Sequence, residues 1–147
     1  MKAFRFRLES VLTLRTWDEE RARTQLAQAL ARERRYERNI SEIDGLIDQA
    51  LTSWMADRRS GGSAAREVGQ WAHLNHLDHN RRDLNAKLQA ARQVREEKTA
   101  GLLECRQKRR VIEKLKERQH DAYRKDIQGR LEREVEDLFN ARFRRES

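Results

Sequence analysis

The chain has 147 residues without a proline, and 39% of them are charged, which is typical of long helices and far from globular averages. Only 37% are hydrophobic, which excludes a thick layered core but leaves enough for a narrow seam between helices. A formal charge of +8 would attract nucleic acid, anionic lipid or an acidic protein surface. Because Lys and Arg alternate with Asp and Glu almost everywhere, the composition favours a solvated helix surface over a dedicated polyanion site.

A stripe of mostly apolar residues predicts a first helix from about residue 4–8 to about residue 57. In alternating steps of four and three, the stripe runs from Leu8 to Trp54, and only Arg15, Glu19 and Glu33 interrupt it. A lone helix has no reason to keep a 3.5-residue period for about seven heptads. The period therefore predicts a left-handed coiled coil.

A turn is expected at residues 58–63, where a Gly pair lies next to Ser. Ser63 is expected to cap a second helix that runs from about residue 64 to about residue 143. One heptad register fits this helix from Leu77 to Ile112, whereas residues 115–138 require at least one slip. Such a slip marks a local unwinding or the point where the partner helix has stopped.

Antiparallel pairing about this turn predicts an all-α fold, in which two long antiparallel helices form one left-handed coiled-coil hairpin over residues 1–147. A turn near residue 61 sets residue i opposite roughly 122 minus i, so that Leu8 faces the region of Lys114. The second helix then outruns the first after about residue 118, by about 40 Å at 1.5 Å per residue. This overhang is expected to be a binding element or a frayed tail. The apolar start of the chain, residues 4–14, is expected to pack on Val111, Ile112 and Leu115.

The sequence gives little support for a metal site, a nucleotide site or a catalytic site. His73, His76 and His79 recur every third residue, so only two of them could reach one metal ion, and no further ligand is placed to help. The Gly61-Gly62 pair lacks the Lys-Ser/Thr of a phosphate loop. A two-helix protein encloses no carboxylate pair in a dry cleft. We therefore expect no catalytic residue, no cofactor and no metal.

Location in the cell is indicated by the cysteine count and by hydropathy. Cys105 is alone, so it is expected to be a reduced seam residue of a cytosolic protein. No apolar run approaches the length of a bilayer span, and the segment Phe4–Leu14 is interrupted by charges. A transit peptide or a surface-seeking amphipathic helix is the alternative for that segment.

Two surfaces are candidates for partner binding. Residues 106–125 hold nine Lys or Arg against three acidic residues, which fits an acidic protein groove or pore as well as it fits a solvated face. Trp71 and Leu74, with Leu46 and Leu51 outside the seam of the first helix, leave more apolar surface near the turn than a two-stranded coil covers. Trp54 is instead expected in the core, packed across on Val68.

Two ordered motifs carry a resemblance to a known family. Residues 4–15 have the pattern Phe-x-Phe-x-Leu-x-x-Val-Leu, and residues 111–118 contain Glu-Lys-Leu-Lys-Glu-Arg, followed by Tyr123 and by an acidic pair at Glu136-Asp137. In these motifs and in their separation, the whole chain resembles the flagellar type III export protein FliJ family. Members are cytoplasmic two-helix coiled coils similar to the central stalk subunit of rotary ATPases.

The resemblance implies a soluble, non-enzymatic stalk or adaptor at the flagellar base, on the cytoplasmic face of the inner membrane. Such a protein binds the hexameric flagellar export ATPase, promotes ring assembly, links the ring to the membrane export gate protein and helps to deliver export chaperones. It binds no nucleic acid and meets the membrane only through its partners. Ring contacts would be carried by Arg109, Arg110, Lys114, Lys116, Arg118, Arg124 and Lys125, and contacts at the hairpin tip by Leu46, Trp71 and Leu74.

Three alternatives remain open from the sequence. The chain could be the equivalent stalk of a virulence type III secretion system, or a basic coiled coil that binds nucleic acid or anionic membrane. It could also form an extended intermolecular coiled-coil dimer in which the Gly pair is not folded back.

Overall fold

The computed structural model describes residues 2–146 of the chain. Helix α1 spans Glu9–Arg59 and helix α2 spans Ala64–Glu146. No strand occurs in these residues, so the fold is all-α with two long helices, as the sequence predicts. Neither helix has, over its described length, a segment apolar enough to cross a membrane. Contacts divide the chain into two compact units, unit 1 with Met1–Glu20 and Leu103–Ser147, and unit 2 with Arg21–Leu102.

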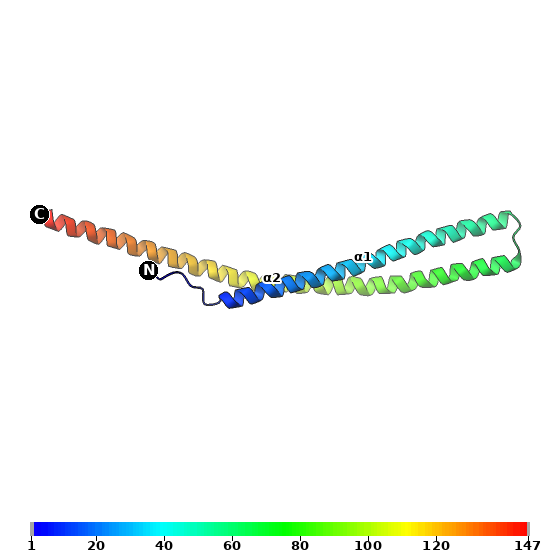
Figure 1. The fold of residues 1–147 in the computed structure, drawn as a ribbon, viewed down its shortest axis with the longest axis horizontal. Coiled ribbons are helices and arrows are strands. Elements are labelled where there is room, and N and C mark those ends of the chain that lie inside the picture. Colours follow the sequence, from blue (N-terminus) through cyan, green and yellow to red (C-terminus); the bar gives the residue numbers. More distant parts are fainter. Residues whose placement is uncertain (1, 147) are drawn as a thin grey trace. The chain divides into compact units, whose positions relative to one another are not determined.

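In unit 2 the two helices lie side by side and antiparallel (Figure 1). Leu77, Leu88, Ala91 and Leu102 of α2 and Ala29 of α1 are its buried apolar residues. Arg81 spans the two helices to Asp44 at 2.8 Å. Since so few side chains of unit 2 are buried, the helices meet along a narrow seam, as the composition requires.

The turn that joins α1 to α2 follows from its glycines. Gly61 has a φ of 76°, in the left-handed region that glycine adopts without strain. The N–H of Gly62 donates to the carbonyl of Asp57 at 3.0 Å and the N–H of Gly61 to that of Arg58 at 3.3 Å, which is the Schellman pattern that ends a helix. The hydroxyl of Ser63 accepts from the N–H of Arg66 at 3.3 Å and caps α2, as the sequence predicts.

Burial along α1 follows the predicted stripe. Every stripe position from Leu8 to Trp54, including the polar Arg15, Glu19 and Glu33, is buried or half-buried. On α2 the alternating steps of three and four hold over buried or half-buried residues from 84 to 116. The irregular spacing expected after residue 112 therefore begins only after residue 116. Lys116 pairs with Glu9, the first residue of α1, so the irregular spacing begins where the pairing of the two helices ends.

Unit 1 contains a feature that the heptad pattern does not predict. Residues 2–6, and the turn at 7–8, precede α1 as a non-helical arm that lies along α2 (Figure 1). The Phe4 ring contacts the His120 ring edge-on, with centroids 5.1 Å apart, and the Tyr123 ring at 5.5 Å. The hydroxyl of Tyr123 donates to the carbonyl of Lys2 at 2.5 Å. Phe6 is buried, with the Lys116 ammonium 6.0 Å from its ring centroid.

The arm explains why the helix begins at Glu9 and not at residue 4. Phe4, Phe6 and Leu8 are buried or half-buried, whereas Arg5 and Arg7 are exposed. This period of two is the pattern of an extended chain, in which alternate side chains point to opposite sides. The Phe-x-Phe-x-Leu motif is therefore part of the arm that lies along α2 and not the first turn of a helix.

Pairing is displaced by about three residues from the expected register. The Lys116 ammonium lies 2.8 Å from the Glu9 carboxylate and Arg106 lies 3.4 Å from that of Glu19, and in each pair the two residue numbers add to 125 instead of 122. Two causes combine: the turn occupies residues 60–63, and helical side chains lean toward the N-terminus of their own helix, by about one residue on each helix. Val111, expected in the packing, is consequently exposed, and only Ile112 and Leu115 are half-buried.

Candidate partner-binding surfaces

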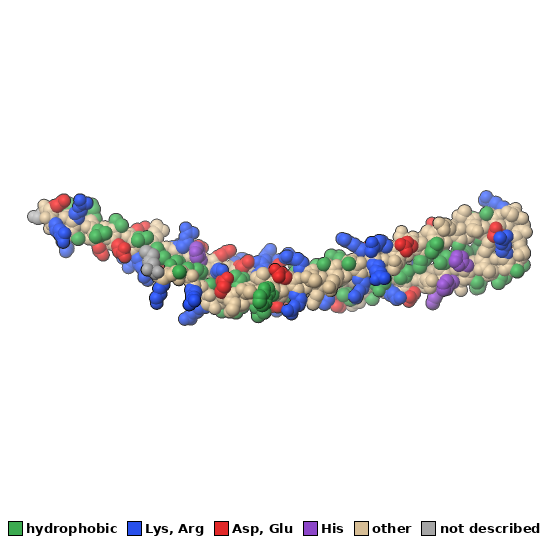
Figure 2. Space-filling model, viewed as in Figure 1, with side chains coloured by type: hydrophobic (Ala, Val, Ile, Leu, Met, Phe, Trp, Pro, Cys, Tyr) green, Lys and Arg blue, Asp and Glu red, His purple; other side chains and the backbone are tan. Residues whose placement is uncertain are grey.

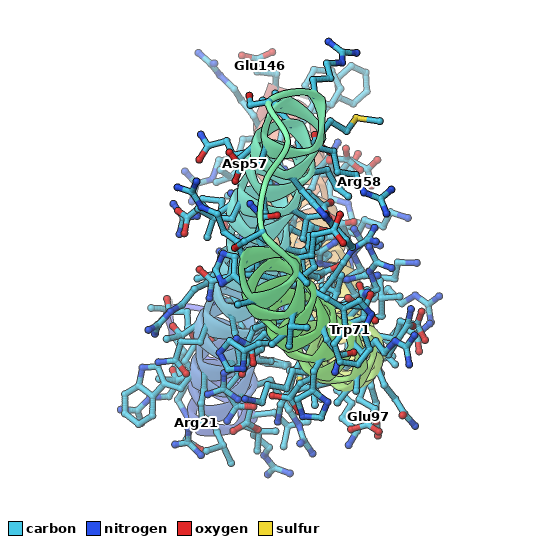
Figure 3. All side chains as sticks on the ribbon, turned by 90° about the vertical axis from the view of Figure 1, so that its right-hand side faces the viewer. Arg21, Asp57, Arg58, Trp71, Glu97 and Glu146 are labelled. Carbon is cyan, nitrogen blue, oxygen red and sulfur yellow. The ribbon has the colours of Figure 1, made fainter. Side chains whose placement is uncertain are left out.

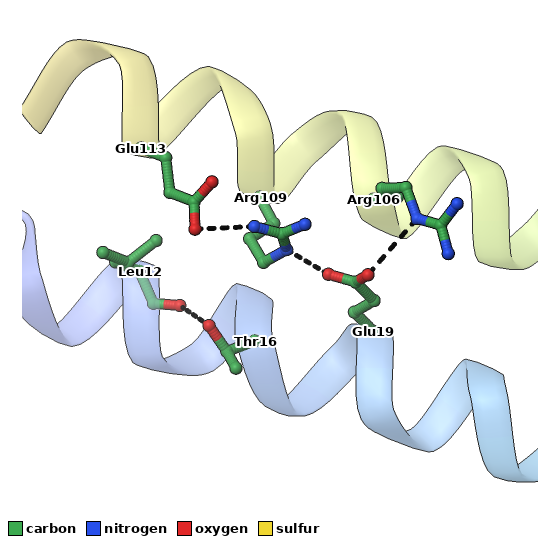
Figure 4. A network of polar contacts seen from close by, with 6 residues as sticks. All are labelled: Leu12, Thr16, Glu19, Arg106, Arg109 and Glu113. Carbon is green, nitrogen blue, oxygen red and sulfur yellow. Dashed lines mark hydrogen bonds and ion pairs between the residues drawn. The ribbon is translucent and has the colours of Figure 1, made fainter. Parts of the chain in front are cut away.

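Glu19 is an acidic residue inside the seam of unit 1. Its exposed fraction is 4%, and it is the one buried charged residue reported in the described chain. Figure 4 shows how α2 neutralises it: the Arg109 guanidinium donates to one carboxylate oxygen, and Arg106 lies 3.4 Å from the other. Arg109 also contacts Glu113, one turn along α2, at 2.6 Å. A buried carboxylate thus becomes part of a network that joins the two helices.

Electrostatics within this network favour the charged forms. Burial alone raises the pKa of Glu19, but the hydrogen bond and charge of Arg109, followed by those of Arg106, outweigh it and hold that pKa below its ordinary value. The hydrogen bonds of Glu19 and Glu113 raise the pKa of Arg109. The Arg109 guanidinium is therefore occupied by Glu19 and Glu113 and helps to join the two helices.

Unit 2 repeats the arrangement. Glu33 lies two heptads after Glu19 on α1, its side chain is 12% exposed, and it is paired with Arg95 at 2.6 Å and Arg92 at 3.5 Å. These arginines lie two heptads before Arg109 and Arg106 on α2. The two acidic interruptions of the apolar stripe are thus matched by two arginine pairs in the opposite helix.

The seven basic residues predicted to contact a partner separate into two groups. Arg109 pairs with Glu19 and Glu113, and Lys116 pairs with Glu9. The other five are exposed and make no ion pair reported in residues 2–146. They fall within a sector of about 120° on the side of α2 opposite the seam, at 100° per residue. We call them the basic face: Arg110, Lys114, Arg118, Arg124 and Lys125.

The three residues predicted at the tip lie in three different places on unit 2. Leu46 is exposed and lines a groove with residues that include Ala50, Ser53 and His73. Leu74 is half-buried in the seam. Trp71, which is 60% exposed, lies outside the groove, and it is labelled in Figure 3, where the turn faces the viewer.

Heptad positions explain this separation. Trp71 directly follows the seam position Gln70, as Leu51 follows Ala50 on α1, and in antiparallel pairs such positions share one flank. Leu46 directly precedes the seam position Ile47 and belongs to the other flank. The structure therefore does not bring Leu46, Trp71 and Leu74 into one surface. Leu51 is also exposed, and by its heptad position it belongs to the flank of Trp71.

Other aromatic and histidine residues near the tip are placed as follows. Trp54 is half-buried, as expected, but Val68 is exposed, and the Arg58 guanidinium lies over the Trp54 ring at 5.6 Å. His73 lines the groove of Leu46, whereas the ring of His76 contacts the Asn80 amide at 3.3 Å. Among residues 2–146 no three His, Cys, Asp or Glu side chains are close enough to hold a metal ion.

Charges of both signs alternate over the visible surface in Figure 2, and only short segments depart from that mixture. The fold and these surfaces define a class: an all-helical protein whose two long helices meet along a narrow, partly ionic seam and whose outer faces carry basic and apolar patches. The family model described as "Flagellar FliJ protein" matches residues 4–147 of the chain. The chain therefore belongs to the FliJ family, as its two motifs predict. No curated protein and no solved structure matches it.

Proposed function

We propose that this chain is a non-enzymatic stalk or adaptor of the flagellar export apparatus, which binds the export ATPase ring, promotes its assembly and links it to the export gate and to export chaperones. Membership of the FliJ family indicates a component of flagellar export. It also favours the flagellar apparatus over a virulence secretion system, because the matching family model is the flagellar one.

The observation that carries the ring assignment is the basic face. Its five side chains extend over about 22 Å of α2, from Arg110 to Lys125, at 1.5 Å per residue. Unlike Arg109 and Lys116, they are not needed to hold unit 1 together, so their charge remains for an acidic partner. Glu117 and Asp121 share the same face. That mixture suits a protein surface with its own pattern of charges better than it suits a uniform polyanion.

Charge reversal tests this proposal. In Arg110→Glu/Lys114→Glu/Arg118→Glu we expect export ATPase binding to fall at least tenfold in affinity and swarming to be lost, because rim charges govern association at moderate salt. The matched control is Arg34→Glu/Arg35→Glu/Arg38→Glu, which reverses three exposed charges on α1 of unit 2 and should leave both unchanged. Unchanged binding and swarming in the first variant would show that the basic face does not contact the ring.

The same variants distinguish nucleic acid or anionic lipid as the partner. Binding of the native chain to DNA or to anionic vesicles at physiological salt, lost in the triple variant, would assign the basic face to a polyanion instead. Loss of that binding well below physiological salt would dismiss this alternative.

The fold proposed for this function is one left-handed coiled-coil hairpin with an overhanging C-terminal helix. Its support is the 3.5-residue spacing of buried positions and the antiparallel ion pairs within each unit. Spin labels at Thr13 and Lys108, both exposed, should lie close together within one molecule at high dilution. A long distance would instead indicate the extended intermolecular dimer.

For the tip we propose that the flank of Trp71 contacts the export gate. An exposed tryptophan with an aliphatic neighbour is the kind of anchor that interfaces use. Trp71→Gln should weaken gate binding without weakening ring binding, and Leu46→Gln, on the opposite flank, is its matched control. Equal effects of the two changes would show that the gate does not distinguish the flanks.

A further inference from the structure

The C-terminal part of α2 in unit 1 carries four large apolar side chains that are exposed to solvent. Val135, Leu138 and Phe139 are 65%, 72% and 68% exposed, and Leu131 is 45% exposed. At 100° per residue the four fall within a sector of about 100°, so they form one apolar stripe along about 12 Å of the helix. Exposed apolar stripes of this kind mark contact surfaces.

Carboxylates line both edges of this stripe. At 100° per residue Glu132 and Glu136 fall at one edge and Glu134 at the other, and no Lys or Arg along the stripe falls at either edge. Glu132 and Glu136 also line an open groove with Leu131 and Val135. Glu134 and Glu136 are exposed and have no ion pair reported among residues 2–146, so their charge is available to a partner.

A second copy of the chain does not fit this stripe. Antiparallel pairing about residue 135 would cover both stripes, but it would set the carboxylates of residues 132–137 against those of the other copy. A parallel pair in register would also place like charges side by side. The basic face has the opposite charge, but Val111 is the one large apolar residue reported as exposed within residues 110–125, so this face has no apolar stripe to offer.

A lipid surface does not fit the stripe either. Anionic lipid would repel the carboxylates at both edges. A neutral bilayer would take water from these carboxylates without supplying an opposite charge. The pattern is complementary instead to a helix whose own apolar stripe has Lys or Arg at both edges. We infer that residues 131–139 are the docking site for such a basic amphipathic helix of another protein.

This docking site is separate from the basic face, which ends at Lys125, and so it does not depend on the ring assignment. The helix is already formed in the single chain, so binding does not have to order it. The contact is short, because Arg142 occupies the next position in line with the stripe. With four apolar side chains and carboxylates at both edges, we expect a Kd on the order of 10 μM.

Synthetic helices test the docking site on the full chain. The probe is a peptide of about three heptads with Leu at positions a and d and Lys at positions e and g, and its control carries Glu at e and g. By fluorescence anisotropy at physiological salt, the lysine peptide should bind with a Kd on the order of 10 μM and the glutamate peptide at least tenfold more weakly. Equal binding of the two peptides, or no binding of the lysine peptide up to about 1 mM, would overturn the inference.

Charge variants of the chain locate the bound peptide. Glu132→Lys/Glu134→Lys/Glu136→Lys should reverse the preference, so that the chain loses the lysine peptide and gains the glutamate peptide. Both affinities should be unchanged in the matched control, which reverses three exposed carboxylates of unit 2: Glu42→Lys/Glu96→Lys/Glu97→Lys. Equal losses in the two variants would show that the peptide responds only to net charge, and the docking site would be refuted.

An apolar variant tests the stripe itself. Val135→Gln/Leu138→Gln should raise the Kd of the lysine peptide at least tenfold, and because both residues are exposed the variant should keep its helicity by circular dichroism. Leu51→Gln/Met55→Gln, which removes two exposed apolar side chains of unit 2, should leave the Kd unchanged. An unchanged Kd in the first variant would contradict a docking site built on the stripe.

A photo-crosslinking amino acid identifies the natural partner in the cell. At Leu138 it should give an adduct whose contacted segment has an apolar stripe between Lys or Arg residues. At Asn140, which lies on the side of the helix away from the stripe, it should not give that adduct. An adduct at Leu138 with a second copy of the chain, with lipid or with an acidic segment would rule out the basic helix.

Discussion

Glu19 and Glu33 occupy equivalent seam positions in units 1 and 2, yet α2 surrounds them differently. Glu19 is 4% exposed and accepts hydrogen bonds from both of its arginines, one of which also holds Glu113. The side chain of Glu33 is more open, and the Arg95 Nε lies 2.6 Å from it without the alignment of a hydrogen bond. The same sequence device thus gives a closed network in one unit and a looser ion pair in the other. The cost of breaking each should differ accordingly.

Removal of the arginine that pairs with each seam glutamate should give the largest difference in stability between the two units. Arg109→Ala leaves a buried carboxylate with one partner and should destabilise unit 1 by about 3 kcal/mol, because an uncompensated buried charge is expensive. Arg95→Ala, beside the more exposed Glu33, should cost about 1.5 kcal/mol. Native-state hydrogen exchange, read separately for residues 9–20 and 21–59, reports each unit. Lys108→Ala, in an exposed pair with Glu104, is the control and should change little; equal losses at Arg109 and Arg95 would contradict the contrast.

The arm of unit 1 has no counterpart in unit 2, and Phe6→Ala should release it. Loss of a buried aromatic ring costs about 3 kcal/mol in ordinary cores, enough to free a segment held by few other contacts. Tryptic cleavage after Arg5 and Arg7 should then accelerate at least tenfold. Phe139→Ala, at an exposed ring in the same unit, should leave the cleavage rate unchanged.

Low pH should remove the stabilising contribution of Glu19 to unit 1. The folded-state pKa of Glu19 lies below its ordinary value, so its stabilising contribution is complete above the pKa of an unfolded glutamate, about 4.3, and is lost as pH falls through the folded-state pKa. Glu19→Gln lacks that contribution at every pH and should be less stable than the native chain by about 2 kcal/mol at pH 7. Urea unfolding from pH 7 to pH 3 should show this difference shrinking toward acid. A difference that grows would reverse the assignment of sign.

The smallest effect on stability is expected at the tip of unit 2. Trp71→Gln should change unfolding by less than about 0.5 kcal/mol, because the ring is mostly exposed. Trp54→Gln, at a half-buried seam position, should cost about 2 kcal/mol and serves as the reference. Thermal unfolding followed by circular dichroism compares the two, and similar losses would place Trp71 in the packed seam.

The regular parts of the molecule could be read from the sequence because they depend on short-range periodicity. The stripe from Leu8 to Trp54, the Gly61 turn and the Ser63 cap are each specified by residues close in the chain. The heptad pattern does not predict the arm, because Phe4 and Leu8 also fit a helical spacing. The alternation of Phe and Arg from Phe4 to Arg7 is nevertheless that of an extended segment.

The candidate sites were harder to predict because they depend on the partner of each side chain. A count of charges over residues 106–125 cannot separate Arg109, held by a glutamate that lies 90 residues earlier, from Arg110, which is exposed. The signal was present in Glu19 and Glu33, 14 residues apart, with arginines at the same separation in α2. The grouping of Leu46 with Trp71 was suggested by proximity along the helices, but position within the heptad decides the flank on which a side chain lies.

The arm has a practical meaning for work with the protein. An extended chain advances about 3.3 Å per residue and a helix only 1.5 Å, so seven residues of arm shield roughly two to four turns of α2. A fusion partner or cleavage scar joined ahead of Lys2 would emerge beside Tyr123, within one turn of Arg124 and Lys125. Because the arm packs on the seam side of α2 and the basic face lies on the opposite side, an N-terminal tag strains the attachment of the arm and leaves the basic face open.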